Sequence, residues 1–140
     1  KWYTAPGMRT GSCMLNYDVA RTYNYIILTE GPLDVFRTGS PTQSETPGPA
    51  VAIFNHKLSA GHLSMLQPFQ QNKKGIIFMM FDQDVWASTE RQFLSLYPLF
   101  GDKLVPVQLP EDQDPGDMDH KDIWACLRNS ARALNVTVEF

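Results

Sequence analysis

Residues 25–36 read YIILTEGPLDVF, an apolar run that leads into two carboxylates. The run itself, up to Glu30, has the length and composition of a buried β-strand. A helix is predicted over residues 31–39, because Pro32 suits a first helical position and the glycine at 39 suits a C-terminal cap. Glu30 therefore ends a strand, and Asp34 lies one helical turn beyond it.

The same alternation of strand and helix continues along the chain. Further apolar strands are predicted at residues 50–54, 76–81 and 104–109, the last one at an edge or a bulge because it contains Pro106. The helices predicted after these strands begin at the N-cap residue Ser59, just after Asp84, and at residue 119. VTVEF, residues 136–140, is a candidate closing strand. This order predicts an α/β fold with a mainly parallel sheet of about four strands and helices on both faces.

Ligands of parallel sheets collect at the carboxyl ends of the strands, and acidic residues follow two of the predicted strands. Glu30 ends the first, and Asp82 and Asp84 follow the third. If these strands are neighbours, three carboxylates converge on one edge of the sheet, close to Asp34. Such a group needs a compensating cation, and an all-oxygen donor set favours Mg²⁺ or Mn²⁺. Each motif also has an ordinary interpretation, because Asp34 favours a helix N-terminus and Asp84 is a suitable N-cap.

Four segments together resemble the Toprim domain of bacterial-type and phage-type DNA primases. They are IILTEGPLDVF, AVAIFNHKLS, IIFMMFDQD and VPVQLPEDQDPGDM. The family pattern is a strand ending in Glu-Gly-x-x-Asp, a later strand ending in Asp-x-Asp, and then an LP…DP loop. The resemblance implies a Toprim-like (Rossmann-like) sheet over residues 25–118. Residues 1–24 would then be the end of an upstream primase-core segment. Residues 119–140 would be a helix and the candidate closing strand, packed on the sheet. The Gly-Pro-Leu-Asp form of the first motif is more similar to phage sequences.

The resemblance implies Mg²⁺-dependent (or Mn²⁺-dependent) nucleotidyl transfer that makes RNA primers on single-stranded DNA during replication. The residues that it assigns are Glu30 as the catalytic residue, Asp34, Asp82 and Asp84 as metal ligands, and Asn55 and Lys57 as nucleotide or phosphate contacts. The implied partners are nucleoside triphosphates, a single-stranded DNA template and a replicative helicase in cis or in trans. Two alternatives stay open, a Toprim nuclease that cleaves phosphodiesters and a metal-free docking module.

The sequence departs from the primase pattern at two places. The turn after Asp84 reads Val-Trp-Ala-Ser where primases commonly carry Ala-Gly-Arg, and Gln113 stands where the family loop has a lysine. Both changes remove a basic group near the expected site, so the phosphate contacts expected from those turns are in doubt. Asp114 and Asp117 of the loop are alternatives between metal ligands and turn residues.

Composition narrows the class of protein further. A chain of 140 residues is expected to form one domain, and its start at Lys1 favours an excised piece of a longer protein. The net charge of −3 argues against gripping nucleic acid by bulk electrostatics. Cys13 and Cys126 form no CxxC pair, which excludes a typical zinc site and predicts reduced, buried thiols.

The remaining residue types add little to the function. The three histidines, at positions 56, 62 and 120, are not at metal-ligand spacing and are predicted to lie on the surface. Trp86, Phe93 and Phe100 recur at helical spacing and are predicted core residues, while Trp2 and Tyr3 are expected to pack against an upstream part. No apolar run reaches the length of a membrane span, so we expect a cytoplasmic protein, in the host cell if it is phage-encoded.

Overall fold

The chain folds around a sheet of four parallel strands, as predicted. The structure is a computed structural model that describes residues 6–43 and 46–140, so Trp2 and Tyr3 lie outside the described residues. The strands are β1 (Tyr25–Thr29), β2 (Ala50–Ala52), β3 (Ile76–Met79) and β4 (Leu104–Pro106), in the spatial order β2-β1-β3-β4. Strand β1 pairs with both β2 and β3, so the neighbouring positions expected for the first and third strands are confirmed.

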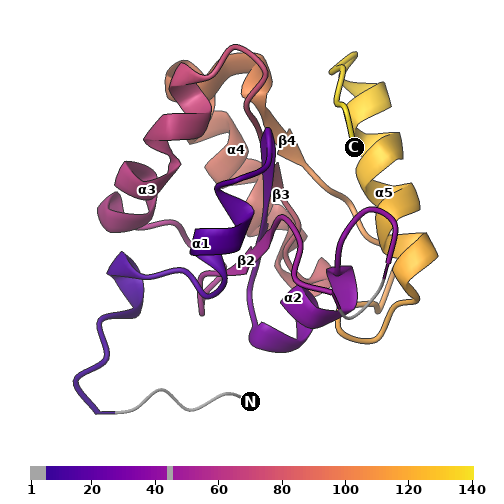
Figure 1. The fold of residues 1–140 in the computed structure, drawn as a ribbon, viewed down its shortest axis with the longest axis horizontal. Helices are drawn as coiled ribbons and strands as arrows, with labels where there is room; N and C mark the ends of the chain where they lie inside the picture. Colours follow the sequence, from indigo (N-terminus) through magenta and orange to yellow (C-terminus); the bar gives the residue numbers. More distant parts are fainter. Residues whose placement is uncertain (1–5, 44–45) are drawn as a thin grey trace.

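Helices cover both faces of this sheet (Figure 1). One face is covered by α2 (Pro32–Thr38) and α5 (His120–Ala133), and the other by α1 (Tyr17–Ala20), α3 (Ala60–Gln71) and α4 (Trp86–Phe100). Short 3₁₀ turns lie at η1 (Thr10–Ser12), η2 (Gln83–Val85) and η3 (Gly101–Lys103). This layering confirms the predicted α/β class.

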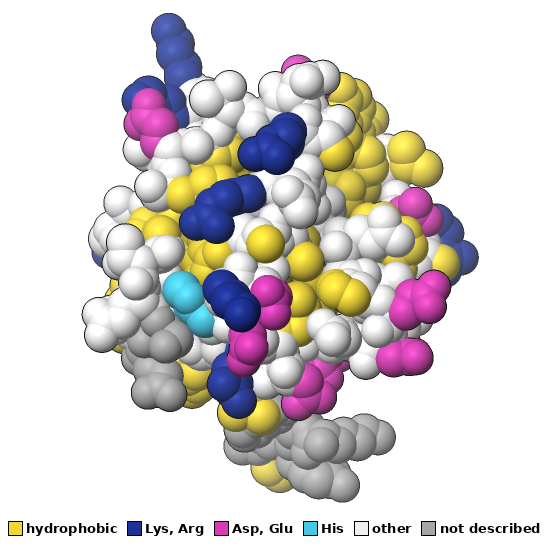
Figure 2. Space-filling view, turned by 90° about the vertical axis from the view of Figure 1, so that its right-hand side faces the viewer, with side chains coloured by type: hydrophobic (Ala, Val, Ile, Leu, Met, Phe, Trp, Pro, Cys, Tyr) yellow, Lys and Arg dark blue, Asp and Glu magenta, His cyan; other side chains and the backbone are white. Residues whose placement is uncertain are grey.

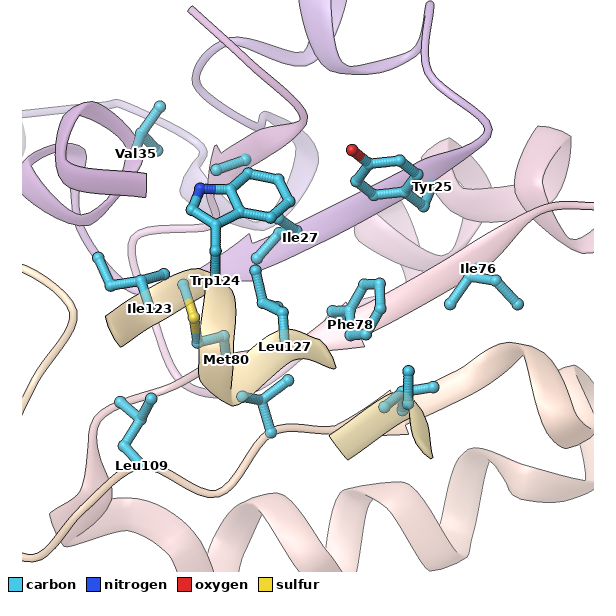
Figure 3. Close-up of a cluster of buried hydrophobic side chains, with 14 of the residues drawn as sticks. Tyr25, Ile27, Val35, Ile76, Phe78, Met80, Leu109, Ile123, Trp124 and Leu127 are labelled. Carbon is cyan, nitrogen blue, oxygen red and sulfur yellow. The ribbon is translucent and has the colours of Figure 1, made fainter. Parts of the chain in front are cut away.

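The side chains of the central strands alternate between two apolar clusters. In β1, Tyr25 and Ile27 face α5, while Ile26 and Leu28 face α3 and α4. All residues of β1 and β3 are buried, which explains why their sequences are almost continuously apolar. Figure 3 shows the first cluster, in which Trp124 of α5 lies over the sheet among Tyr25 and Ile27.

The segment before β1 covers the outer edge of β2. Leu15 and Ala52 exchange backbone hydrogen bonds of 3.0 and 3.3 Å in an antiparallel bridge. The ring of His62 is buried, and its Nε2 donates toward the carbonyl oxygens of Thr10 and Cys13 at 2.9 and 3.1 Å. The surface position predicted for His62 is therefore wrong, because this side chain fastens the N-terminal segment to α3.

The predicted closing strand is also wrong. Residues 136–140 pair with no strand, and they run back along α5. The ring of Phe140 packs against Tyr25 and Phe78, with centroids 5.2 and 5.8 Å apart. Glu139 is held by an ion pair with Lys74 at 2.9 Å. The segment therefore covers the first apolar cluster through aromatic contacts and does not add a strand to the sheet.

Three smaller expectations need adjustment. The last strand ends at Pro106 and not at residue 109, although the N–H of Val107 still donates to the carbonyl of Met79 at 2.9 Å. Strand β4 lies at the edge of the sheet, which is where a proline is tolerated. Phe93 and Phe100 join the second apolar cluster, but Trp86 is half-buried and belongs to neither cluster. Both cysteines are free thiols that are half-buried and not fully buried.

No helix among residues 6–43 and 46–140 combines the length and the apolar character needed to cross a bilayer.

Candidate functional site

The pairing of β1 with β3 brings Glu30 and Asp82 together. The two strands run parallel in register, so the residues that follow them emerge side by side at the carboxyl edge of the sheet. The backbone N–H of Asp82 donates to Glu30 Oε1 at 3.3 Å. Asp84 lies two residues further on, in η2, and is exposed. The convergence predicted from the sequence is thus confirmed for Glu30 and Asp82.

Asp34 is fixed at the start of α2 by local hydrogen bonds. The N–H of Gly31 donates to Asp34 Oδ2 at 2.7 Å, and the hydroxyl of Thr38 donates to the Asp34 carbonyl at 2.6 Å. The side chain caps the helix N-terminus, as the ordinary interpretation of Asp34 predicts. Only 7 % of the residue is exposed. One carboxylate oxygen serves the cap, and the Gly116 backbone interacts with the carboxylate as well, so the side chain is held at the acidic edge from two sides.

The loop after β4 adds Asp114 to this group. A backbone hydrogen bond of 3.4 Å from Gln83 to the carbonyl of Gln113 ties the loop to η2. A Cβ at Gly116 would lie 3.1 Å from Asp114 Oδ1 and 3.3 Å from Asp34 Oδ1, so the glycine lets the loop approach both carboxylates closely. Asp114 Oδ1 also accepts the N–H of Asp117 at 3.1 Å. Asp114 is therefore a turn residue that also lies beside the acidic group, and its role as a metal ligand stays a prediction.

These residues line an open cleft of about 810 Å³. Its carboxylates are Glu30, Asp34, Asp82, Asp84, Asp114 and Asp117, and no Lys or Arg is found among the described residues that line it. The first four were predicted from the sequence as site residues and Asp114 and Asp117 as alternatives, whereas Phe54 and Gly116 carry no sequence signal for this cleft. A cleft with six carboxylates and no basic side chain has a strongly negative potential and attracts cations.

The end of β2 contributes the other rim of the cleft. Asn55 and His56 line it, whereas Lys57 is exposed and lies outside the lining. The Oδ1 of Asn55 accepts the N–H of His56 at 2.8 Å, which leaves the amide nitrogen of Asn55 available. Phe54 has a φ of 58°, an uncommon conformation for a bulky residue, and it turns the chain sharply here. The structure therefore brings Asn55 to the acidic group and leaves Lys57 outside it.

Crowding of the carboxylates shows in their pKa values. Burial raises the pKa of Glu30 to about 7, and repulsion from Asp82 and Asp84 adds to the increase. Burial also raises the pKa of Asp34 to about 6, with repulsion from Asp82 and Asp114. The pKa of Asp82 rises to about 6 because of burial and the nearby Asp114 and Asp84. Each group is therefore less stable as an anion here than in water, which a bound cation would reverse.

The donor set suits a divalent metal of the Mg²⁺ type. Oδ1 of Asp82 is buried and has no hydrogen-bond partner among the described residues, so it is a carboxylate oxygen without a counter-group. No three His, Cys, Asp or Glu side chains of the described residues form a ready-made metal cage. Mg²⁺ commonly binds through one or two carboxylates, several waters and substrate phosphates, and does not require such a cage. The oxygen donors of the cleft are therefore chemically compatible with a site made of one or two carboxylates, waters and substrate phosphates.

Comparison with known proteins identifies the fold. No protein-family model matches the chain, and no curated protein matches it by sequence. Among solved structures, it is similar to the Aquifex aeolicus primase with its zinc-binding and RNA polymerase domains, with a TM-score of 0.61 and 20% identity over 91% of this chain. It is also similar to the RNA polymerase domain of Mycobacterium tuberculosis primase DnaG, with a TM-score of 0.62 and 20% identity over 93% of this chain.

The same Mycobacterium tuberculosis domain in complex with double-stranded DNA gives a TM-score of 0.57 at 20% identity. This chain spans 32% of the Aquifex aeolicus chain and 42–43% of the Mycobacterium tuberculosis chains. At this level of identity the likeness concerns the fold, which is that of part of a bacterial primase. The Toprim-like fold expected from the motifs agrees with it.

Proposed function

We propose that this chain is the metal- and nucleotide-binding part of a DNA primase. In this role it supports Mg²⁺-dependent or Mn²⁺-dependent nucleotidyl transfer that extends an RNA primer on single-stranded DNA. The observation that carries the proposal is the convergence of six carboxylates in one cleft at the carboxyl edge of a primase-like sheet. A triphosphate is an anion, so it enters such a cleft only together with divalent cations that neutralise both partners.

The residues of the cleft divide this work among them. Asp82 and Asp84 would hold the metal, and Asp34, fixed by the hydrogen bond that it accepts from Gly31, would add negative charge beside it. A metal bound there neutralises phosphate charge and favours attack by the 3′-hydroxyl of the primer. Glu30 lies beside Asp82 and is placed to orient that ligand or to accept a proton. Asn55 on the rim offers its amide to the nucleotide.

The proposal includes partners beyond this chain. The template would be single-stranded DNA, the substrates nucleoside triphosphates, and a replicative helicase would act in cis or in trans. The remaining segments of a longer primase would hold the template, because the cleft itself repels a phosphate backbone in the absence of metal. The chain alone is therefore expected to bind metal and nucleotide more readily than it makes primers.

Metal binding by the 140-residue chain is the first test. Isothermal titration calorimetry should show that the chain binds Mn²⁺. The binding should be tighter when ATP is present. Asp82→Asn should weaken it at least tenfold, because it removes the unpartnered carboxylate oxygen. Glu90→Gln removes one charge from an exposed position on α4 and serves as the control. Absence of binding at millimolar Mn²⁺ would favour the metal-free docking module.

The reaction is tested with a complete primase polypeptide that includes this chain. Single-stranded template, the four nucleoside triphosphates and Mg²⁺ should yield short RNA products, and Glu30→Gln should abolish them while Mn²⁺ binding persists. A shortened template with no RNA product would favour the nuclease. The two readouts separate synthesis from cleavage in a single reaction.

A further inference from the structure

Helix α5 carries a stripe of basic side chains on its outer surface. Lys121, Arg128 and Arg132 are exposed, and they recur at spacings of seven and four residues. At 3.6 residues per turn, these spacings keep all three on one side of the helix. Figure 2 looks onto the side of the molecule where α5 lies, and it shows Lys and Arg side chains over this face, with Asp and Glu side chains next to some of them. The stripe is a basic line along one helix of a chain whose net charge is −3.

A groove of about 450 Å³ lies between the C-terminal half of α5 and the segment that follows it. Arg128 and Arg132 line it, together with Asn135 and Phe140. No Asp or Glu is present among the described residues of this lining, because Glu139 is turned away into its ion pair with Lys74. Neither arginine forms an ion pair with any described residue. The groove therefore offers two guanidinium groups that are not neutralised by the protein itself.

An aromatic ring lies next to these charges. Phe140 is 38 % exposed, and the guanidinium carbon of Arg128 lies 5.8 Å from its ring centroid. The ring stacks on Phe78 at a centroid distance of 5.8 Å, and it has edge contacts with Tyr25 and Trp124 at 5.2 and 5.6 Å. A base that contacts the ring therefore takes the place of the Arg128 guanidinium, which moves from the ring to a phosphate. Basic side chains along a groove with a partly exposed aromatic ring are the combination that binds single-stranded nucleic acid, through phosphates and a stacked base. An acidic peptide would use the arginines but has no base to place on the ring.

The groove and the acidic cleft lie at opposite ends of the sheet. Thr137 and Val138 of the groove also line a hollow beside Asn24 and Ile76, which stand at the amino ends of β1 and β3. The carboxylates of the cleft follow the carboxyl ends of the same strands. Phosphates bound in the groove are therefore distant from the negative potential of the cleft.

We propose that this groove binds a single nucleic-acid strand without a metal ion, with Arg128 and Arg132 on its phosphates and Phe140 against a base. The site is independent of the proposed nucleotidyl transfer, since it requires no divalent cation and shares no residue with the cleft. Both DNA and RNA single strands present this chemistry, and the experiment below compares them.

The test measures binding of fluorescein-labelled oligo-dT and oligo-U, each of about ten nucleotides, to the 140-residue chain by fluorescence anisotropy in EDTA. Arg128→Ala/Arg132→Ala should weaken binding at least tenfold and reduce the slope of log K against log salt by about 1.4, because each phosphate contact to a single strand contributes about 0.7. Phe140→Leu keeps an apolar side chain, and should weaken binding about fivefold or more through the loss of stacking.

Matched variants keep the proposal falsifiable. Arg21→Ala/Arg91→Ala removes the same charge from exposed positions outside α5 and should change binding less than twofold. Arg132→Ala alone removes a side chain that makes no ion pair or aromatic contact in the described structure, so it reports on charge if the double variant unfolds. Equal weakening by the control, no binding in EDTA, or equally tight binding of poly-glutamate would each overturn the proposal. Tighter binding of oligo-dT or of oligo-U would support it and identify the strand.

Discussion

Removal of one charge from the acidic cleft should stabilise the metal-free protein. We choose Asp82→Asn, because Asn has nearly the same shape and only the charge is lost. Burial and the neighbouring carboxylates Asp114 and Asp84 raise the pKa of Asp82 to about 6, so its anion is unfavourable in the folded state. Its Oδ1 is buried without a hydrogen-bond partner among the described residues, which leaves the anion uncompensated.

The size of the effect follows from the pKa. The increase from 3.8 to about 6 corresponds to about 3 kcal/mol at 1.36 kcal/mol per unit. Asp82 is half-buried, and solvent screens part of the repulsion, so the expected gain for Asp82→Asn is about 1–2 kcal/mol. For a chain of this size, such a gain corresponds to an increase in Tm of about 3–8 °C.

The sign depends on pH in a defined way. At pH 8 Asp82 is ionised in both the folded and the unfolded state, and the folded state bears the unfavourable interaction. Below about pH 6, the folded protein takes up the proton before the unfolded chain does, so the penalty shrinks as the pH falls further. Below the unfolded pKa of 3.8, both states are protonated and the variant has no advantage. The gain should therefore be full at pH 8 and nearly absent near pH 4.

Urea unfolding in EDTA at both pH values measures this difference, with Glu90→Gln as the control for a charge lost elsewhere. Addition of Mg²⁺ at pH 8 should stabilise the wild type more than Asp82→Asn, because the metal binds the folded carboxylates. A variant that is less stable than the wild type at pH 8 in EDTA, or a gain of the same size at pH 4, would refute the electrostatic account of the cleft.

Three further substitutions test the fold that supports the cleft. Trp124→Phe should destabilise the chain by about 1–3 kcal/mol in urea unfolding, because the Thr38 carbonyl loses its 2.8 Å hydrogen bond from the indole and stays buried. Gly75→Ala should lower Tm by several degrees in calorimetry, because a Cβ there would collide with the backbone carbonyl of Phe69. Asn16→Ala removes two 2.9 Å side-chain hydrogen bonds to the backbone just before and within β2, and should cost about 1–2 kcal/mol in urea unfolding. Asn16→Gly separates that loss from the strain of its φ of 69°.

The sheet was predictable because it is covered on both faces. A strand that is buried on both sides must be apolar at nearly every position, so residues 25–29 and 76–79 stand out in the sequence. Caps were predictable for a similarly local reason. Ser59 accepts the N–H of His62 at 3.2 Å, as its place before an amphipathic helix indicates.

Contacts between distant parts of the chain were not predictable from such local patterns. Burial of His62 depends on carbonyl oxygens of Thr10 and Cys13, about fifty residues earlier, and no periodicity in the sequence records this contact. The path of residues 136–140 is a similar case. Alternating Val and Thr are typical of a strand, but the ring of Phe140 packs on Tyr25 and Phe78, and these aromatic contacts fix the segment elsewhere.

The candidate site shows the same division. Glu30 and Asp82 were predictable because each follows an apolar strand, and the polarity of a parallel sheet brings such positions to one edge. Asp114 lies in a loop whose path depends on the hydrogen bond between Gln83 and the carbonyl of Gln113, so its place in the cleft needed the structure. Sequence identifies the acids that end strands, and the structure adds those that a loop delivers.

The arrangement of charge is consistent with the proposed role of this net acidic chain in nucleotidyl transfer. Carboxylates concentrated at the carboxyl edge of the sheet make the cleft selective for cations, and therefore for nucleotides that arrive with metal. The same potential would repel a bare phosphate backbone, so any strand that the chain holds without metal must bind elsewhere. Arg128 and Arg132 line a groove whose residues Thr137 and Val138 also lie beside the amino ends of β1 and β3, away from the cleft. On the two proposals, this separation lets one small domain attract metal and nucleic acid without either site neutralising the other.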